Sequence, residues 1–301
     1  MNLIAAPQPD RVGAAYDETV ELHSELFGDD LHFGFWSTDQ EEGDRDGDGG
    51  TPYEQLARAS RRLTDEFARR LHVRPGQRIL DIGSGAGGPA VHIAKATGAE
   101  VVGITVSSDQ VRQATALAEK EGLSDRVSFR LCDATRPLPF AESSFDAVLA
   151  LESFIHIEAR HAALTYAARV LRPGGRIVLS DFFERSPIPP EKQPAVERYC
   201  REFNLSRLAK SDFYPRLFQN AGFVFAEQLD ITEATMPPTI LRMGEIAQGR
   251  EFRDRFGERA AHYDRSDLLP VWELGYLLVA GVRSPSEARR AALRNHPEAA
   301  G

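Results

Sequence analysis

The chain has 301 residues, of which 42% are hydrophobic and 27% are charged, and these proportions are ordinary for a folded globular protein. Its 36 basic and 45 acidic residues give a net charge of −9, which disfavours binding to the phosphate backbone of nucleic acids. The apolar runs are too short to span a membrane, and the first residues lack the pattern of a secretory signal. The two cysteines, Cys132 and Cys200, are far apart in the chain. We therefore expect a cytoplasmic protein with no membrane or nucleic-acid partner, no disulfide and no bound metal.

Residues 1–50 form an irregular N-terminal segment. Residues 11–27 have a helical pattern, and residues 31–36 (LHFGFW) are a compact aromatic cluster. Residues 39–50 combine acidic residues with glycines, which indicates a mobile, solvated loop. Thr51 has the side chain of a helix N-cap, and a helix with apolar residues at three- to four-residue spacing should follow it.

Strands and helices alternate between residues 78 and 182. The segments with the length and apolar character of buried strands are 78–83, 100–105, 126–131, 145–151 and 176–182. Helical patterns lie between most of them, at 87–97, 108–121 and 159–171. This alternation favours βαβ units and a parallel sheet covered by helices on both faces.

The pattern is less regular after residue 182. Helices are expected at 195–209, 211–221 and 238–262, and strands at 222–230 and 272–282. We divide this part of the chain into a region at 183–270, a final strand at 271–284 and a tail at 285–301.

A glycine-rich turn follows the first strand. The segment ILDIGSGAGG ends its strand near Asp81 and then has glycines at positions 83, 85, 87 and 88. Glycine permits the positive φ angles and close backbone approach that such a turn needs, and open α/β sheets bind ligands at this end of their strands. Gly83, Gly85 and Gly88 also satisfy the GxGxxG pattern of dinucleotide-binding proteins, which is a weak signal by itself.

Three features argue against a nicotinamide dinucleotide. Asp81 lies inside the strand, where dinucleotide-binding strands are usually apolar. The second strand ends in Thr105, Val106 and Ser107, without the ribose-binding acid of a dinucleotide site. Residues 168–175 (ARVLRPGG) precede the fifth strand, and this segment is not part of a dinucleotide fold.

All three features resemble the class I S-adenosylmethionine-dependent methyltransferases, over about residues 31–282. The motifs LDIGSGAG, CDATRPLPFAESSFDAV and ARVLRPGGRIVLSD carry this resemblance. LHFGFW, VGITVSSDQV and ALESFIHI are similar to its small-molecule group, which includes natural-product O-methyltransferases, tocopherol- and sterol-type C-methyltransferases, cyclopropane fatty-acid synthases and amino-acid N-methyltransferases.

The resemblance implies an α/β, Rossmann-like fold with a mostly parallel seven-stranded sheet, helices on both faces and a helical substrate lid. Residues 51–182 would form the S-adenosylmethionine-binding core, and residues 1–50 would cap the cofactor. Residues 183–270 would form the lid over the substrate.

The resemblance also assigns cofactor residues one by one. The assigned residues are Asp81, Gly83, Gly85 and Gly87 at the methionine end, Thr105 and Gln110 at the ribose, Asp133 and Ala134 at the adenine, Leu151 beneath the sulfonium, and Tyr16 and Trp36 as a cover over the methionine part. Thr105 and Gln110 replace the ribose-binding acid of many relatives. A hydroxyl and an amide can also bind a diol, although without charge-assisted hydrogen bonds.

The candidate catalytic residues are His156, Asp181 and Glu152, at or just beyond the carboxyl ends of strands four and five. His156 has an ordinary pKa of about 6.5, which suits a general base. Many sugar O-methyltransferases with this pattern have two adjacent histidines, whereas this chain has Ile155 before His156. ESFIH also resembles glycine-type N-methyltransferases. Asp181 would orient a substrate hydroxyl or His156, and Glu152 would act as a base or support the cofactor site.

The region after strand five is aromatic and apolar, through Phe182, Phe183, Tyr199, Phe203, Phe213, Tyr214, Met236 and Met243. Such a lining suits a sizeable, partly apolar small molecule. We therefore expect methyl transfer to an oxygen, or to a carbon, of a natural product such as a polyketide, macrolide, glycoside or terpenoid, with S-adenosylhomocysteine as the second product.

Several alternatives stay open at this point. A cyclase or pericyclase on the same fold would bind S-adenosylmethionine without transferring its methyl group, and a small-molecule N-methyltransferase would transfer it to nitrogen. A nicotinamide oxidoreductase is disfavoured by the absent ribose acid. The protein could be a monomer or a homodimer.

Overall fold

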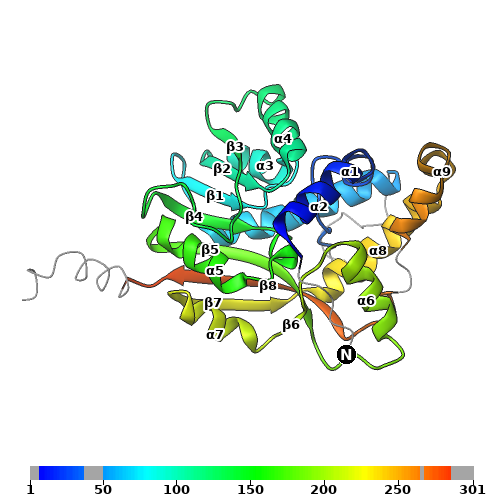
Figure 1. Ribbon diagram of the computed structural model, residues 1–301. Helices are drawn as coiled ribbons and strands as arrows, with labels where there is room; N and C mark the ends of the chain where they lie inside the picture. Colours follow the sequence, from blue (N-terminus) through cyan, green and yellow to red (C-terminus); the bar gives the residue numbers. More distant parts are fainter. Residues whose placement is uncertain (1–6, 37–49, 265–267, 286–301) are drawn as a thin grey trace, which may run out of the picture.

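The computed structural model describes residues 7–36, 50–264 and 268–285. A central sheet has the strand order β3-β2-β1-β4-β5-β8-β7, and the short β6 pairs with β5 (Figure 1). The strands are β1 (Arg78–Ile82), β2 (Glu100–Thr105), β3 (Val127–Leu131), β4 (Phe145–Ala150), β5 (Leu171–Glu184), β6 (Ala209–Lys210), β7 (Phe223–Asp230) and β8 (Leu274–Arg283). The first five strands pair in parallel, and β8 runs antiparallel to both β5 and β7. The mostly parallel sheet is therefore confirmed, with β6 as an eighth, two-residue strand.

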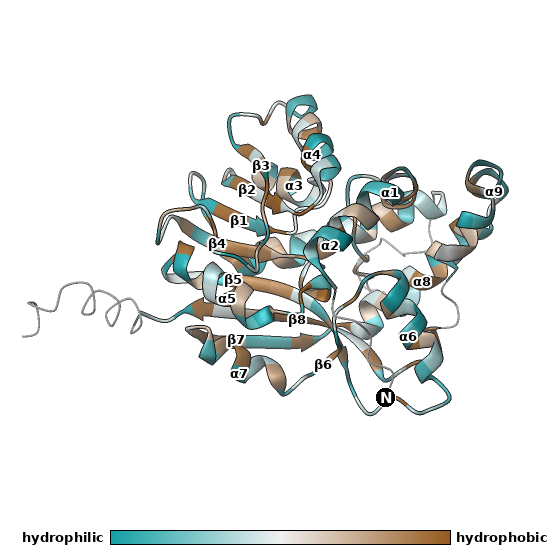
Figure 2. Cartoon of the chain, in the orientation of Figure 1, coloured by the Kyte–Doolittle hydropathy of each residue, from teal (hydrophilic) through white to brown (hydrophobic). Residues whose placement is uncertain are grey.

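Successive residues of the inner strands pack on opposite faces of the sheet. Ile79 belongs to one hydrophobic cluster and Leu80 to the other. Ala147 and Val148 divide in the same way. Because side chains alternate along a strand, a strand covered on both faces must be apolar throughout. This explains the continuous apolar runs of the sequence, and Figure 2 shows β4 and β5 largely in the hydrophobic colour.

Helices cover both faces. The helices are α1 (Pro9–Phe27), α2 (Pro52–Leu71), α3 (Gly88–Thr97), α4 (Ser108–Lys120), α5 (Arg160–Val170), α6 (Gln193–Glu202), α7 (Phe213–Asn220), α8 (Thr232–Gln248) and α9 (Arg250–Phe256), with short 3₁₀ helices η1 (Phe154–His156) and η2 (Gly257–Tyr263). Leu63 of α2, Ile93 of α3 and Ile240 of α8 belong to one cluster, whereas Leu164 of α5 and Leu217 of α7 belong to the other. No helix in the described ranges is long and apolar enough to span a membrane.

The helix α2 begins as its sequence predicts. Thr51 caps it by accepting a hydrogen bond from the Glu54 amide, and the Glu54 side chain accepts one from the Thr51 amide. This reciprocal pair satisfies two amide groups that the helix leaves without partners. The helices α1, α6, α8 and α9 gather on one side of the molecule, beyond the ends of the strands (Figure 1).

Three predicted elements have clearly different bounds in the structure. The helix expected at 195–209 ends at Glu202, because Asn204 adopts a left-handed conformation with φ +50°. The strand expected from residue 176 begins at Leu171, and residues 172–175 form an irregularity in its pairing with β4. The helix expected at 238–262 begins at Thr232, continues through Pro237 and Pro238 and ends at Gln248, and α9 and η2 follow it. Most of the predicted acidic loop lies outside the described residues.

Candidate active site

A cavity of about 510 Å³ lies at the carboxyl ends of β1, β2, β3 and β4. The turn after β1 forms one wall, and the first two turns of α1 with the residues just before it form another. This volume is typical of a site for a small molecule or cofactor, and the position is the one at which open α/β sheets bind ligands.

The glycines of the first turn allow the cavity to reach the backbone. Gly83 and Gly85 line it, with φ angles of +75° and +53°. A Cβ at Gly83 would overlap the side chain of Ser153, so the close approach of these two segments requires glycine. Gly87 has φ +91° and is the N-cap of α3. Gly87 does not line this cavity but packs against Ala114 and Phe129.

Asp81 is buried directly before the lining residues Ile82 and Gly83. Its Oδ2 has no hydrogen-bond partner among the described residues, and the same holds for the hydroxyls of Ser84 and Ser153. Burial raises the pKa of Asp81 to about 7. A buried carboxylate without a partner would gain from a cation, and the α-ammonium of S-adenosylmethionine is one. Ser153 lines the cavity, whereas Asp81 and Ser84 lie just behind its lining, and their unpartnered oxygens fit the methionine end of that cofactor.

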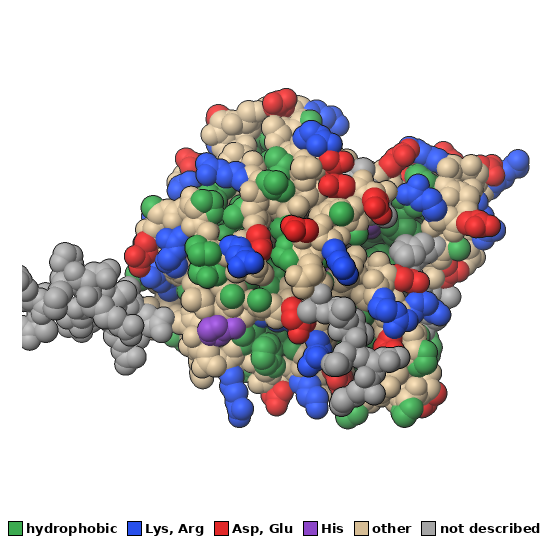
Figure 3. Space-filling view, in the orientation of Figure 1, with side chains coloured by type: hydrophobic (Ala, Val, Ile, Leu, Met, Phe, Trp, Pro, Cys, Tyr) green, Lys and Arg blue, Asp and Glu red, His purple; other side chains and the backbone are tan. Residues whose placement is uncertain are grey.

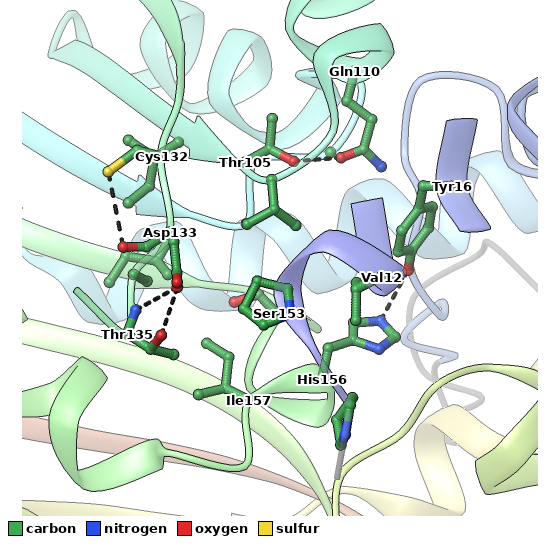
Figure 4. Close-up of a pocket in the computed structure, with 18 of the residues that line it drawn as sticks. Val12, Tyr16, Thr105, Gln110, Cys132, Asp133, Thr135, Ser153, His156 and Ile157 are labelled. Atoms are coloured by element: carbon green, nitrogen blue, oxygen red, sulfur yellow. Dashed lines mark hydrogen bonds between the residues drawn. The ribbon is translucent and has the colours of Figure 1, made fainter. Parts of the chain in front are cut away.

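Thr105 and Gln110 lie together on the cavity wall (Figure 4). The Thr105 hydroxyl donates to Gln110 Oε1 over 2.6 Å. This bond turns the amide so that Gln110 offers its NH₂ group as a donor, while the Thr105 oxygen keeps lone pairs to accept with. A pair with one donor and one acceptor matches a diol such as a ribose.

Asp133 and Ala134 line the far end of the cavity, after β3. Oδ1 of Asp133 accepts from the Thr135 amide over 2.8 Å and from its hydroxyl over 2.7 Å (Figure 4). Oδ2 lies 3.8 Å from the Arg136 guanidinium. Asp133 is thus a turn residue that also faces the cavity.

The helix α1 closes the cavity. Pro9, Asp10, Val12 and Tyr16 line it. The helix is tied to the turn after β2, because Asp17 accepts a hydrogen bond from the Ser107 hydroxyl. A Cβ at Gly13 would overlap the carbonyl oxygen of Val106, so the two backbones touch there.

A second, inner cavity of about 50 Å³ adjoins the first and shares Tyr16, Leu31, Glu152 and His156 with it. The remaining lining is mostly aromatic and aliphatic: His23, Phe27, His32, Phe33, Ile155, Phe182, Tyr199, Phe203, Leu205, Ile240, Met243 and Tyr263. No lysine or arginine is among these described residues, and Glu152 is the one carboxylate in this lining.

His156 stands at the junction of the two cavities. Its Nδ1 lies 3.1 Å from the carbonyl oxygen of Asn204, which can only accept, so Nδ1 carries the proton. Its Nε2 lies 2.9 Å from the Tyr16 hydroxyl (Figure 4). Burial lowers the pKa of His156 and so favours the neutral ring. In that state Nε2 has a lone pair, and Tyr16 donates to it.

Glu152 joins three segments beneath the junction. Its Oε1 accepts from the Phe33 amide over 2.7 Å and from the Tyr276 hydroxyl over 2.9 Å. Its own amide donates to Ser180, and its φ of +49° is unusual for a residue other than glycine. Burial raises the pKa of Glu152 to about 7, although both hydrogen bonds oppose the shift. Glu152 is therefore anchored on one oxygen and lines both cavities.

Asp181 does not face either cavity, contrary to our expectation. It is fully buried, and Arg160 binds both of its oxygens, at 2.6 and 3.3 Å. The Tyr214 hydroxyl donates to Oδ2 over 2.8 Å. A carboxylate neutralised and hydrogen-bonded in this way is a structural group rather than a base that contacts an acceptor.

Trp36 also lies elsewhere. It is buried, and its Nε1 donates to Thr239 of α8 over 2.9 Å, while its amide donates to the Ala234 carbonyl. It does not line the cofactor cavity. Trp36 thus joins the aromatic segment at 31–36 to α8. Among the described residues before residue 37, Tyr16 and Leu31 are the ones that line both cavities.

Several site residues were not predicted. Ser153 and Ile157 line the cofactor cavity, and Phe33 and Tyr276 hold Glu152. Ser153 and Ile157 belong to the motif ALESFIHI, so their position in this motif could have indicated that they lie at the site. Tyr276 lies in the last strand, 124 residues from Glu152, and nothing local to the sequence indicates that contact.

Comparisons with known proteins agree with this geometry. Residues 80–179 match the methyltransferase domain family. The chain is 38% identical to methyltransferase GfsG of Streptomyces halstedii, over 89% of this chain and 92% of the relative. It is also 38% identical to 27-O-demethylrifamycin SV methyltransferase of Amycolatopsis mediterranei, over 77% and 80%.

Solved structures show the same fold. The [4+2]-cyclase SpnF is 27% identical, with a TM-score of 0.75 over 93% of this chain and 98% of that one. Geranyl diphosphate C-methyltransferase from Streptomyces coelicolor A3(2), 19% identical, has a TM-score of 0.71 over 93% and 99%. The relatives, the family match and the cavity lead to one conclusion: the chain belongs to the S-adenosylmethionine-dependent methyltransferases, enzymes that transfer a methyl group from this cofactor to small molecules.

Proposed function

We propose that the acceptor is a hydroxyl oxygen of an uncharged, partly apolar natural product, and that His156 is the general base. The observation that supports this most directly is the Nε2 lone pair of His156, held at the junction of the cofactor cavity and the apolar inner cavity. The relatives add support, because one of them methylates an oxygen of a rifamycin.

The lining of the inner cavity supports an uncharged acceptor. An anionic acceptor such as a diphosphate would require basic side chains, or a metal ion held by several carboxylates. The described lining of this cavity has no basic side chain and only one carboxylate, Glu152. The basic residues Arg201, Arg207 and Lys210, which lie on α6 and after it, are exposed. An isoprenoid diphosphate therefore fits the site poorly, although geranyl diphosphate C-methyltransferase shares the fold.

The residues of the junction would perform the proton transfer. When bound, S-adenosylmethionine supplies an activated methyl group on its sulfonium. Thr105, Gln110 and Asp133 of the lining would hold the cofactor together with the buried Asp81 behind it, and α1 would exclude water from its side of the site. His156 Nε2 would accept the proton of the acceptor hydroxyl in the place now taken by the Tyr16 hydroxyl.

Methyl transfer from cofactor labelled with ¹³C in its methyl group tests the proposal. We expect labelled oxygen methyls on neutral hydroxylated polyketides or macrolides, and none on matched carboxylates or isoprenoid diphosphates. A labelled methyl on nitrogen or carbon of the preferred acceptor would contradict it.

A cyclase is the second candidate, because the chain is similar to SpnF over nearly its whole length. A cyclase would convert its substrate while the amount of S-adenosylmethionine stayed constant. The oriented lone pair of His156 favours methyl transfer, because proton removal from a hydroxyl requires such a base. The cytoplasmic location stays a prediction. The protein is also expected to be a monomer or a homodimer, and light scattering of the purified protein distinguishes these two states.

A further inference from the structure

We propose that the C-terminal cap of α6 is a positioning element for the base: Asn204, held by Ser206 and Arg160, places its carbonyl group so that His156 keeps its proton on Nδ1 and its lone pair on Nε2. The catalytic consequence rests on the function proposed above, whereas the tautomer itself does not. Asn204, Ser206 and Arg160 would be positioning residues, since they act through His156.

The cap of α6 fixes the direction of the Asn204 carbonyl. The Leu205 amide donates to the Cys200 carbonyl over 2.8 Å, and the Asn204 amide donates to the Arg201 carbonyl over 3.3 Å. These two bonds, with Asn204 at φ +50°, form a Schellman cap. Asparagine adopts this left-handed conformation more readily than other residues with side chains, and a β-branched residue strongly disfavours it.

Ser206 connects this cap to the segment that carries His156. Its amide donates to the Ile155 carbonyl over 2.6 Å, one residue before the histidine. Its hydroxyl accepts from Arg160 Nη2, also over 2.6 Å. The Arg207 amide donates to Glu158 over 3.0 Å. The residues that follow Asn204 are thus joined to the other segment on both sides of His156.

Arg160 anchors the arrangement in the core. Arg160 is 5% exposed, and its guanidinium binds Asp181, which is fully buried and also hydrogen-bonded to Tyr214. A buried ion pair with all its partners in place is rigid, because moving one group leaves another charge unpaired. Such an anchor suits a residue that must hold a catalytic side chain to a fraction of an ångström.

Among the groups around His156, the Asn204 carbonyl is the one that selects the tautomer of the ring. From α1, Tyr16 bonds Nε2 and His23 packs against the Tyr16 ring. Glu152 lines the same cavities, and Asp181 of β5 acts on His156 at a distance while Arg160 neutralises it. Because the Tyr16 hydroxyl can donate or accept, only the Asn204 carbonyl requires one protonation pattern of the ring.

Three substitutions test the proposal. Asn204→Gly preserves access to the left-handed conformation, Asn204→Val disfavours it, and Ser206→Ala removes the hydroxyl contact to Arg160. We expect roughly a tenfold lower kcat with little change in KM for Asn204→Val and Ser206→Ala, and recovery to within about threefold of wild type for Asn204→Gly. Thr235→Val, which removes a buried hydroxyl in α8, serves as the control and should leave kcat unchanged.

Long-range ¹H–¹⁵N NMR spectra of the histidine rings give a readout that needs no substrate. We expect the Nδ1–H tautomer of His156 in the wild type and in Asn204→Gly, and a mixture of tautomers in Asn204→Val and Ser206→Ala. A wild type with Nε2–H, or a Ser206→Ala variant with unchanged tautomer and unchanged kcat, would overturn the proposal. If the wild type shows the Nδ1–H form but transfers no methyl group, the proposed function fails while the positioning element stands.

Discussion

At the scale of single residues, His156 is the group on which proton transfer depends. We expect His156→Gln to lower kcat by about 10²–10⁴-fold, because a general base contributes an effect of that size. The dissociation constant for S-adenosylhomocysteine should stay within about twofold, since other residues hold the cofactor. Steady-state kinetics and calorimetry measure the two quantities.

His161→Gln is the matched control for that variant. His161 is exposed on α5 and lies 3.4 Å from the Asn220 carbonyl, away from both cavities. Its kcat should equal that of the wild type. A His156→Gln enzyme with kcat within threefold of the wild type would show that another group accepts the proton.

Asp81 gives a second prediction, on pH. Because burial raises its pKa to about 7, the folded protein without cofactor binds a proton that the unfolded chain releases near pH 4. Its contribution to stability is therefore present below about pH 4 and is lost as the pH rises to 7. Between pH 5 and 8 the free energy of unfolding should decrease less in Asp81→Asn than in the wild type, and the difference should be a few kcal/mol at most. Denaturation curves at several pH values measure this.

Cofactor binding should respond to the same group in the opposite direction. A cationic ammonium favours the ionised form of Asp81, so the wild type should bind S-adenosylhomocysteine about tenfold more tightly at pH 8 than at pH 6. Asp81→Asn should bind it weakly at both. Equal affinities of wild type and variant at pH 8 would remove Asp81 from the cofactor site.

The residues that could be predicted are those within local motifs. Gly83, Gly85, Thr105 and Gln110 lie in or beside the motif segments, and each lines the cavity. Asp181 of β5 was misjudged because its partner, Arg160, comes from the helix α5, and no local pattern pairs the two residues. The carbonyl of Asn204 could not be predicted at all, since every residue has a carbonyl and only the fold places this one beside His156.

At the scale of elements, α1 acts as one wall of the cofactor site. We expect Gly13→Ala to raise the dissociation constant for S-adenosylhomocysteine about tenfold, because the added Cβ would overlap the Val106 carbonyl and push the helix away. Alanine stabilises a helix relative to glycine, so a loss of helix stability would not explain the effect. Calorimetry measures the constant.

Ala14→Ser is the control in the same helix. Ala14 is exposed, so one added atom there meets no described neighbour closely, and cofactor affinity should not change. Similar affinities for Gly13→Ala and wild type would mean that α1 can shift without cost to the site.

The alternation of strands and helices was predictable because its apolar periods are strong between residues 78 and 182. Beyond that point the patterns depend on packing. The end of α6 had a usable signal in Asn204, a residue common in helix caps. The two-residue strand β6 had none, since it forms only where the chain passes the end of β5.

At the scale of the whole molecule, the inner cavity is too small for a natural product. Its volume of about 50 Å³ is well below the roughly 300–1,000 Å³ of ordinary small-molecule sites. An acceptor can therefore enter only if the helices around that cavity separate. Acidic and basic side chains are mixed over the face seen in Figure 3, without a broad patch of one sign that would steer a charged partner.

Hydrogen exchange tests which part of the molecule the cofactor holds closed. With S-adenosylhomocysteine at about 100 times its dissociation constant, the amides of α1 that exchange by opening of the site should slow by up to about 100-fold. Those of α7, which packs on the opposite face of the sheet, should change little. Equal protection of α1 and α7 would show that α1 does not open by itself.

The most direct test of the cofactor site is a calorimetric titration of the wild type and Asp81→Asn with S-adenosylmethionine, S-adenosylhomocysteine and NAD. We expect micromolar binding of the first two ligands to the wild type, a large loss of affinity in the variant, and no binding of NAD to either protein. Binding of NAD alone, or equal binding of S-adenosylhomocysteine by both proteins, would contradict the assignment of this cavity.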